Sequence, residues 1–249
     1  MAKKRYTDLT DQQLFDGIRA CYNNGLNHFN NALFNSENHG LGIALFVISI
    51  EELIKANALY HCYIGLEEQE TIEIAFNSKD KHRTRLKMAL GLNSSHQLME
   101  QLDVVSNIEK KVLNSNLELN LGDLFNPERM KSFYEQSQEL LKDDIEELKE
   151  SSEEIKKEFE QHTNWFLHAQ HKKEKGFYAD LTNNKWEVPS SLTAKDYQEA
   201  KSHSTPIFEQ ISGPIKTIVE ASNPIRNLLR STAKNFIEMA KTDDNNTYE

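Results

Sequence analysis

The sequence predicts an all-α protein: a helical bundle with one helix of about 40 residues and short connections. Two observations support this class. Only 9 of 249 residues are Gly and 5 are Pro, which is few turn formers for a protein built of many short strands. Apolar residues also recur at intervals of three and four along most of the chain. We expect one domain over residues 1–249, because a chain of this length can bury a core without disulfides.

The first two helices are predicted near the N-terminus. Thr7 or Thr10 is expected to cap the first, with Asp8 and Asp11 near its positive end. It runs through LFDGIRACYNNGLNHFNNALF, and NSENHG then makes a turn. The second helix, from about residue 41 to 63, is apolar almost all round, as is typical of a helix buried inside a bundle.

The middle of the chain is predicted to hold a short basic helix, capped by Ser78 and ended by Gly91, and then SSHQLMEQLDVVSNIEKKVL as another helix. The longest helix is expected from about Pro127 to His171. Its heptad positions are Leu141, Ile145, Leu148, Ser152, Ile155, Phe159, His162 and Phe166. Such a pattern packs either inside the bundle or across a dimer as a coiled-coil arm, and the spacing leaves both open.

The C-terminal part is predicted to begin with a loop that contains a short extended turn. Thr193 then caps a helix that Pro206 and Pro214 are expected to break or kink. The last helix starts at about Pro224, and DDNNTYE forms a frayed tail. In this scheme a core of residues 8–190 carries the helices of about 193–241 packed on it.

The charge of the chain is uneven. The net charge is −10, which by itself disfavours a nucleic-acid partner. Residues 135–160, however, hold 11 acidic and 4 basic side chains, so the rest of the chain carries only −3. The acidic total therefore describes one solvated helix and leaves room for a basic cleft elsewhere.

The cellular compartment is suggested by what the sequence lacks. Cys21 and Cys62 are too few for a disulfide framework or a zinc ligand set. The N-terminus has no apolar signal core, and the longest strongly apolar run, residues 41–50, is too short to cross a bilayer. We therefore expect a cytoplasmic protein with no membrane partner.

The second helix carries a polar patch at its centre, in the segment SIEELIK. At 100° per residue, Glu51, Glu52 and Lys55 fall within an arc of about 100°, and Ser49 lies about 60° farther round. Charges on a buried helix must pair or face a cleft, because an unpaired buried ion costs several kcal/mol. One interpretation is a Glu51–Lys55 salt bridge at the edge of the core. The other is a functional cleft that positions a substrate.

Three short motifs follow one another along the chain. They consist of Ser49, Glu51, Glu52 and Lys55, then His82 and Arg85 in HRTR, then Lys173, Gly176 and Tyr178 in KEKGFYAD, with Asp180 and Pro189 after them. In order and spacing, over roughly residues 10–190, the sequence resembles the AbiV family of bacterial abortive-infection proteins. Arg85 stands where that family usually has Lys.

The resemblance implies a fold and an activity. The AbiV family is similar to the HEPN superfamily, whose helical bundles dimerise and often act as metal-independent ribonucleases. The resemblance therefore implies a HEPN-like bundle that forms a homodimer and needs no cofactor. It also implies RNA rather than DNA as the partner and a phage-encoded protein as the trigger. The usual HEPN signature Arg-x(4–6)-His is absent from the sequence, and the pair Lys173 and Tyr178 is expected to stand in its place.

Metal-free RNA cleavage needs a base, an acid and cations around the phosphorane. The expected catalytic residues are Glu52, Lys55, His82 and Tyr178, and the expected substrate-binding residues are Ser49, Glu51, Arg85 and Lys173. The segment SKDKHRTRLK, residues 78–87, is either a phosphate-steering patch or simply a solvated basic helix.

Two rival interpretations are kept. Two of the histidines His162, His168 and His171, together with Glu158, could bind zinc, but no HExxH motif or Cys pair supports a metal site, so none is expected. The rival in function is a non-catalytic defence regulator that binds RNA or a protein through the same polar patch. Cleavage of RNA in EDTA distinguishes this regulator from the enzyme.

Overall fold

The computed structural model describes residues 6, 8–92, 142, 153, 156–157, 160–178, 180–182 and 185–246. The chain divides into two compact units, residues 1–91 with 164–249 and residues 92–163. All eight residues predicted for the site lie in the first unit, which is the one described below. The single domain expected over residues 1–249 stays a prediction, because few residues of the second unit are described.

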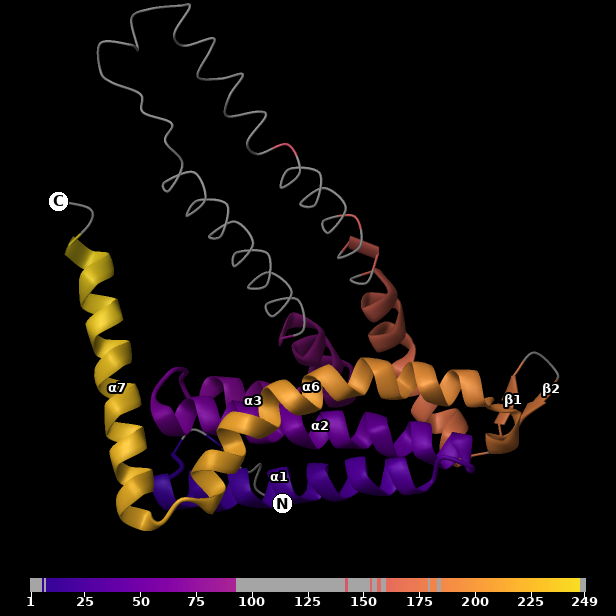
Figure 1. Ribbon diagram of the computed structural model, residues 1–249, viewed down its shortest axis with the longest axis horizontal. Helices are drawn as coiled ribbons and strands as arrows, with labels where there is room; N and C mark the ends of the chain where they lie inside the picture. Colours follow the sequence, from indigo (N-terminus) through magenta and orange to yellow (C-terminus); the bar gives the residue numbers. More distant parts are fainter. Residues whose placement is uncertain are drawn as a thin grey trace, which may run out of the picture. The chain divides into compact units, whose positions relative to one another are not determined.

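The first unit is built around two long helices. Helices α1 (Asp11–Phe34) and α2 (His39–Ile64) run side by side (Figure 1). The short helix α3 (Glu70–Asn77) and the long helix α6 (Ala194–Glu220) both pack on α2. Helix α7 (Asn223–Asn246) begins after a sharp turn at the end of α6. Residues 81–92 and 160–177 are also helical.

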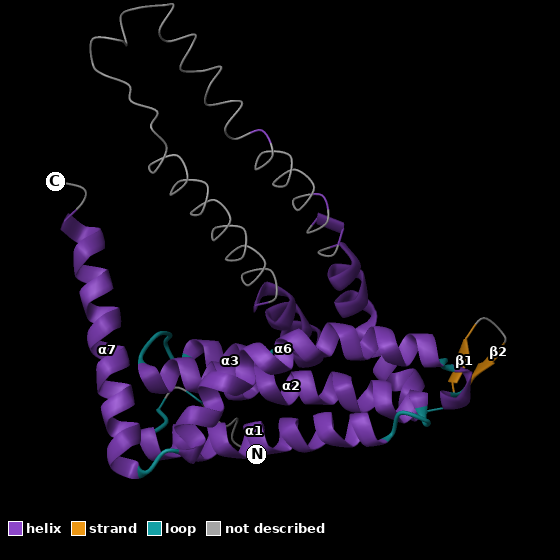
Figure 2. Cartoon of the chain, in the orientation of Figure 1, coloured by secondary structure: helices purple, strands orange, loops and turns teal. Residues whose placement is uncertain are grey.

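The all-α class is confirmed, with a minor addition. Helices dominate the described residues, and the addition is a small hairpin followed by a 3-10 turn (Figure 2). Strand β1 (Asp180–Thr182) pairs antiparallel with β2 (Lys185–Glu187), and η2 (Pro189–Ser191) follows. The hairpin lies where a short extended turn was predicted. The long helix predicted over residues 127–171, with most of its heptad pattern, lies largely outside the described residues.

Helix α2 is held tightly against α1 near its middle. Neighbouring side chains along α2, such as Ile50 and Leu53, are fully buried. A Cβ added at Gly25 of α1 would come within 2.9 Å of Leu53 Cγ, so the glycine lets the helices approach closely. The hydroxyl of Ser49 donates a hydrogen bond of 2.8 Å to the Gly25 carbonyl oxygen. This contact fixes the rotation of α2 and therefore the direction of the polar patch beside Ser49.

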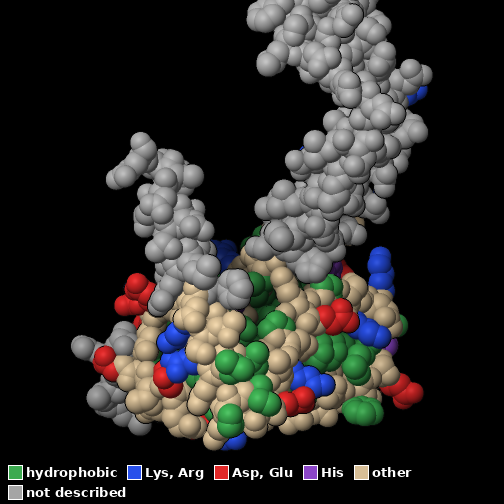
Figure 3. Space-filling model, turned by 60° about the vertical axis from the view of Figure 1, so that its left-hand side comes forward, with side chains coloured by type: hydrophobic (Ala, Val, Ile, Leu, Met, Phe, Trp, Pro, Cys, Tyr) green, Lys and Arg blue, Asp and Glu red, His purple; other side chains and the backbone are tan. Residues whose placement is uncertain are grey.

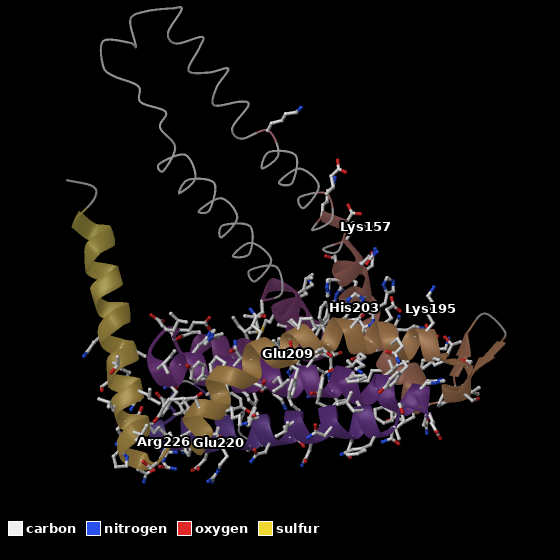
Figure 4. The ribbon with its side chains drawn as sticks, in the orientation of Figure 1. Lys157, Lys195, His203, Glu209, Glu220 and Arg226 are labelled. Carbon is white, nitrogen blue, oxygen red and sulfur yellow. The ribbon has the colours of Figure 1, made fainter. Side chains whose placement is uncertain are left out.

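Helix α6 covers the helix of residues 160–177 with aromatic contacts. The imidazole of His203 stacks on Trp165, with ring centroids 5.3 Å apart, and Figure 4 labels His203 on α6 beside that helix. Trp165, Phe166 and Ala169 are buried. This packing anchors the helix whose last turns enter the polar patch.

Several predicted helix ends are wrong. The helix predicted to end at His171 continues to residue 177, and Gly91 is helical and does not terminate its helix. Pro206 and Pro214 do not break helix α6, which is continuous, but Figure 1 shows it bending, in agreement with the alternative of a kink.

Helix α7 continues to Asn246, into the tail that was expected to fray. Two capping predictions are confirmed, since Thr10 and Thr193 each form a capping box. The Ser78 cap is wrong: Ser78 ends α3, and Asp80 Oδ1 accepts the backbone N–H of Arg83 at the start of the helix of residues 81–92. Helix α3 was not anticipated. Within the described parts of the chain, no helix has both the length and the apolar content needed to cross a bilayer.

Candidate functional site

The carboxylate of Glu51 is the centre of the candidate site. Its side chain is only 5% exposed, yet three cationic or basic groups reach it. Lys173 Nζ donates to Oε1 at 2.7 Å, His82 Nδ1 lies 2.6 Å from Oε2, and Arg85 Nη1 donates to Oε2 at 3.4 Å. We call Glu51, His82, Arg85 and Lys173 the Glu51 cluster.

Two members of the cluster come from one helical turn. His82 and Arg85 are three residues apart on the helix of residues 81–92, so their side chains share a face. Arg85 is buried, and its Nε donates a 2.7 Å hydrogen bond to the carbonyl oxygen of Ala75 in α3. The guanidinium therefore joins α3, this helix and α2, which explains why it is held inside the protein.

Lys173 enters the cluster from a distant part of the chain. It lies on the helix of residues 160–177, 122 positions after Glu51, and it is buried. One turn later, a Cβ added at Gly176 would lie 2.3 Å from the Gly40 carbonyl oxygen of α2. Because Gly176 lacks a side chain, the two helices can approach closely enough for Lys173 to reach Glu51.

The charges around Glu51 keep it ionised. Burial alone raises the pKa of this carboxyl, but hydrogen bonds and charges from Lys173 and His82 outweigh burial and lower the pKa below its ordinary value. His82 Nδ1 lies between the Glu51 carboxylate, at 2.6 Å, and Lys173 Nζ, at 3.3 Å. In the tautomer with its proton on Nδ1, the ring donates this hydrogen bond to Glu51, and Nε2 is the nitrogen that can accept a proton. The His82 side chain is 39% exposed, so it is the member of the cluster that solvent reaches.

Glu52 and Lys55 form a separate pair. Lys55 Nζ contacts Glu52 Oε1, three residues away on α2, and both side chains are 15% exposed. The ammonium also lies 5.6 Å from the ring centroid of Phe76. The Glu51–Lys55 salt bridge, one of the two interpretations of the polar patch, is therefore wrong, because Glu51 pairs with Lys173 and Lys55 pairs with Glu52.

Cys21 of α1 is a neighbour of this region that the sequence analysis missed. Burial raises the pKa of its thiol to about 11, and the charges of Lys55, Glu52 and Arg85 modify that value. The thiol is therefore neutral near pH 7. Cys21 belongs to none of the sequence motifs. Only the folded structure shows that it lies near both the Glu52–Lys55 pair and Arg85 of the Glu51 cluster.

The structure separates two other predicted site residues from the Glu51 cluster. Ser49 is fully buried, and its hydroxyl is used in the contact with α1. Tyr178 is 68% exposed, and its ring contacts Phe177. Among the described residues, no hydrogen bond or ion pair joins Tyr178 to the Glu51 cluster.

The basic segment of residues 78–87 remains largely at the surface. Lys79, Lys81, Arg83 and Lys87 are exposed, whereas Arg85 is buried. On the face shown in Figure 3, basic, acidic and hydrophobic side chains are interspersed. The described residues contain no group of three or more His, Cys, Asp or Glu that could hold a metal ion.

Comparison with known proteins places the chain in a family. The model of the AbiV family, within the HEPN group, matches residues 13–204. This match covers more than three quarters of the chain and includes all eight predicted site residues, whereas α7 lies beyond it. No curated protein and no solved structure matches the sequence. The chain belongs to the AbiV family of abortive-infection proteins, in the HEPN superfamily.

Proposed function

We propose that this protein is a metal-independent ribonuclease of antiphage defence, cytoplasmic and homodimeric, which a phage-encoded protein triggers. The contact between Glu51 and His82 carries the proposal. A buried carboxylate, ionised at neutral pH, holds Nδ1 of a half-exposed imidazole at 2.6 Å. This is how enzymes fix the tautomer and orientation of a histidine that transfers protons.

The reaction that fits this arrangement is transphosphorylation. His82 Nε2 takes the proton of an RNA 2′-hydroxyl, and Glu51 stabilises the imidazolium that forms. The 2′-oxygen attacks the adjacent phosphorus, and the bond from phosphorus to the 5′-oxygen breaks. The leaving oxygen takes a proton from a general acid, such as Lys55 or water. The products are a 2′,3′-cyclic phosphate and a 5′-hydroxyl.

The charge of the Glu51 cluster favours a phosphodiester. Arg85 and Lys173 place two basic side chains against the one carboxylate of Glu51, which favours an excess of positive charge near His82. Both cations are buried, so they act as positioning residues. The exposed Lys81 and Arg83, which flank His82 in sequence, are proposed to contact the RNA backbone.

The remaining predicted site residues take different roles in this proposal. Ser49 holds α2 in place through its bond to Gly25. The pair of Glu52 and Lys55 stays a proposed acid–base pair beside the Glu51 cluster. Tyr178, being exposed, is proposed to stack on a base, a contact worth about 1–3 kcal/mol.

The experiment compares two histidines. Purified wild type, His82→Ala and His61→Ala are incubated with total RNA and tRNA in EDTA, with and without lysate from infected cells. His61 is the matched control, because its Nδ1 also contacts a carboxylate, Glu67, at 3.2 Å. We expect discrete products from wild type and His61→Ala, and cleavage reduced about 100-fold or more in His82→Ala. Equal loss in both variants contradicts the proposal.

One observation favours the regulator as a second candidate. Arg85 and Lys173 are buried and already bonded to Glu51, so the network is satisfied without a substrate. A regulator would use the exposed His82 and its basic neighbours only to bind RNA or a protein. RNA that stays intact in EDTA with lysate, while the gene still lowers phage plating, would establish this reading and reject the ribonuclease.

A further inference from the structure

A pocket lies at the end of the bundle that carries the hairpin of β1 and β2 (Figure 1). Its volume of about 670 Å³ falls within the roughly 300–1,000 Å³ that is typical of ligand sites. The turn between α1 and α2 forms one side of the pocket, and η2 with the residue after it forms the other. None of the lining residues belongs to the Glu51 cluster. They are Glu37, Asn38, His39, Pro189, Ser190 and Leu192.

The walls of the pocket are held in place by tight packing. A Cβ added at Gly40 would lie 2.8 Å from the Pro189 carbonyl oxygen, so this glycine lets η2 approach the start of α2 closely. The imidazole of His39 packs beside the ring of the buried Tyr197, with ring centroids 6.1 Å apart. With Leu192, which is also buried, these residues give the pocket a rigid and partly aromatic wall. Such a wall suits a flat ring.

The polar groups of the pocket are available for a ligand. Asn38 caps α2, and its Oδ1 accepts the backbone N–H of Leu41 at 3.3 Å. This bond leaves the Nδ2 amide group of Asn38 as a donor. In the part of the chain that the structure describes, no hydrogen bond or ion pair engages the Glu37 carboxylate or the Ser190 hydroxyl. The pocket therefore combines an unused carboxylate with a neighbouring amide donor.

The charge of the pocket decides which part of a nucleotide it can hold. Among the six described residues that line it, none is Lys or Arg, whereas Glu37 brings a carboxylate. A phosphate would therefore be repelled. A carboxylate instead favours a ligand with two adjacent N–H donors, which it can accept with its two oxygens.

Guanine is the RNA base with this pattern. On its Watson–Crick edge, N1–H and the N2 amino group are adjacent donors, and the acceptor O6 lies beside them. Adenine and cytosine have one amino donor next to a ring acceptor, and uracil has one donor between two acceptors. The Glu37 carboxylate matches the two donors of guanine, and the Asn38 amide matches O6. Such readout of an unstacked base is common in RNA recognition.

We infer that this pocket binds a guanine base of single-stranded RNA. Glu37 accepts hydrogen bonds from N1 and N2, Asn38 Nδ2 donates to O6, and His39 stacks on the ring. The inference rests on the proposed function, because that proposal supplies RNA as the ligand. The pocket would then select which phosphodiester of the RNA reaches His82.

The position of the pocket agrees with this role. His39 and Glu51 are 12 residues apart on α2, which is roughly 18 Å and can be bridged by a few nucleotides of extended RNA. Tyr178 follows two residues after Gly176, which packs on Gly40 at the same end of α2. A strand that passes from the Glu51 cluster beside Tyr178 therefore reaches the pocket.

An arginine of a protein partner is the less suitable occupant. A guanidinium also offers two parallel N–H donors to a carboxylate. It has no acceptor, however, so it leaves the Asn38 amide without a partner. Guanine uses both groups.

The test measures binding of short labelled oligouridines to the full-length chain by fluorescence anisotropy in EDTA. Their riboses are 2′-O-methylated, which removes the attacking hydroxyl and prevents cleavage. The central base is guanine, hypoxanthine or adenine. We expect wild type to bind the guanine oligonucleotide about tenfold or more tightly than the adenine one. Hypoxanthine, which lacks the N2 amino group, should fall between them.

The key variant is Glu37→Gln, in which the three oligonucleotides should bind almost equally. The matched control is Glu209→Gln, because Glu209 is an exposed carboxylate of α6, away from the lining residues (Figure 4). This control should keep the full preference for guanine. Both positions are exposed, so neither change is expected to alter the circular dichroism spectrum.

Several results would overturn the inference. Equal binding of the guanine and adenine oligonucleotides by wild type removes the guanine site, and a preference that survives in Glu37→Gln places it elsewhere. Guanosine monophosphate that binds as tightly as the oligonucleotide assigns the pocket to a free nucleotide. Binding of N-acetylarginine amide that depends on Glu37, without a guanine preference, assigns it to a protein partner.

Failure of the pocket and failure of the ribonuclease give different results. The binding assay needs no cleavage, so a guanine preference that depends on Glu37, together with RNA that stays intact in EDTA, rejects only the ribonuclease. Cleavage that depends on His82, together with equal binding of the three oligonucleotides, rejects only the guanine pocket.

Discussion

Glu51 and Glu52 are neighbours in sequence but have different environments. Glu51 is bound by residues 31, 34 and 122 positions away, whereas Glu52 pairs with Lys55, one turn along the same helix. The 100° between successive helical residues turns one carboxylate toward two other helices and leaves the other with a local partner. The same residue type on one helix thus contributes a tertiary link in one case and a local ion pair in the other.

The two carboxylates differ in the state of the cations that remain when each carboxylate is removed. Without Glu51, two buried cations lose their counter-ion, and an unpaired buried charge costs far more than a surface one. Without Glu52, Lys55 keeps the Phe76 ring nearby, and its flexible stem can carry the ammonium to water. Substitution of each member in turn measures this contrast.

The largest effect is expected for Glu51→Gln. Glutamine keeps the shape of the side chain but leaves Lys173 and Arg85 buried beside a neutral amide. We expect the free energy of unfolding to fall by about 3–5 kcal/mol, the typical cost of breaking a buried ion network. Urea denaturation followed by circular dichroism measures it.

The control for this prediction is Glu52→Gln, which should cost about 1 kcal/mol or less. Adding Lys173→Met to Glu51→Gln tests the contact itself, because partners in direct contact are not additive. The double variant should be more stable than the two single losses predict. Equal losses for Glu51→Gln and Glu52→Gln would contradict the contrast.

A smaller effect is expected from pH. Lys173 and His82 hold the pKa of Glu51 below its ordinary value of 4.5, against the opposing effect of burial. A carboxyl whose pKa is lower in the folded than in the unfolded protein stabilises the fold. This stabilisation is complete at a pH above the pKa of the unfolded state and is lost as the pH falls through the pKa of the folded state. The difference in unfolding free energy between wild type and Glu51→Gln should therefore be full above pH 4.5 and shrink below it. A difference that grows on acidification would contradict this sign.

The smallest effect is expected for Lys55→Met. Methionine preserves most of the apolar stem and removes one partly exposed ion pair, so stability should change by about 1 kcal/mol or less. Thermal unfolding measures this change, and phage plating tests whether the ammonium has a further role. Loss of protection by a fully folded Lys55→Met protein would make Lys55 functional even though it lies outside the Glu51 cluster.

The sequence predicted the parts of the site that depend on local rules. Periodicity identified α2 as a buried helix with a polar centre, and capping rules placed Thr10 and Thr193 at helix starts. The partner of Glu51 was not predictable in this way. Spacing on one helix favours Lys55, whereas the true partner arrives on a helix that was expected to have ended at His171.

The family motifs predicted part of the site that helical periodicity could not. They named Glu51, His82, Arg85 and Lys173, which the structure brings together. They also named Ser49 and Tyr178, which the structure places in a helix contact and at an exposed position. A motif groups residues by their order along the chain, and only the packing of the helices decides which of them meet.

The distance along the chain between Glu51 and Lys173 has a consequence for protein synthesis. Ribosomes make Glu51, His82 and Arg85 early, but the ammonium that completes the cluster comes 122 residues after Glu51. A growing polypeptide, or a fragment left by premature termination, therefore carries an incomplete set of charges. The cluster forms only when translation has passed residue 173 and Gly176 has closed onto Gly40. Assembly of the Glu51 cluster is thus coupled to synthesis of more than two thirds of the chain.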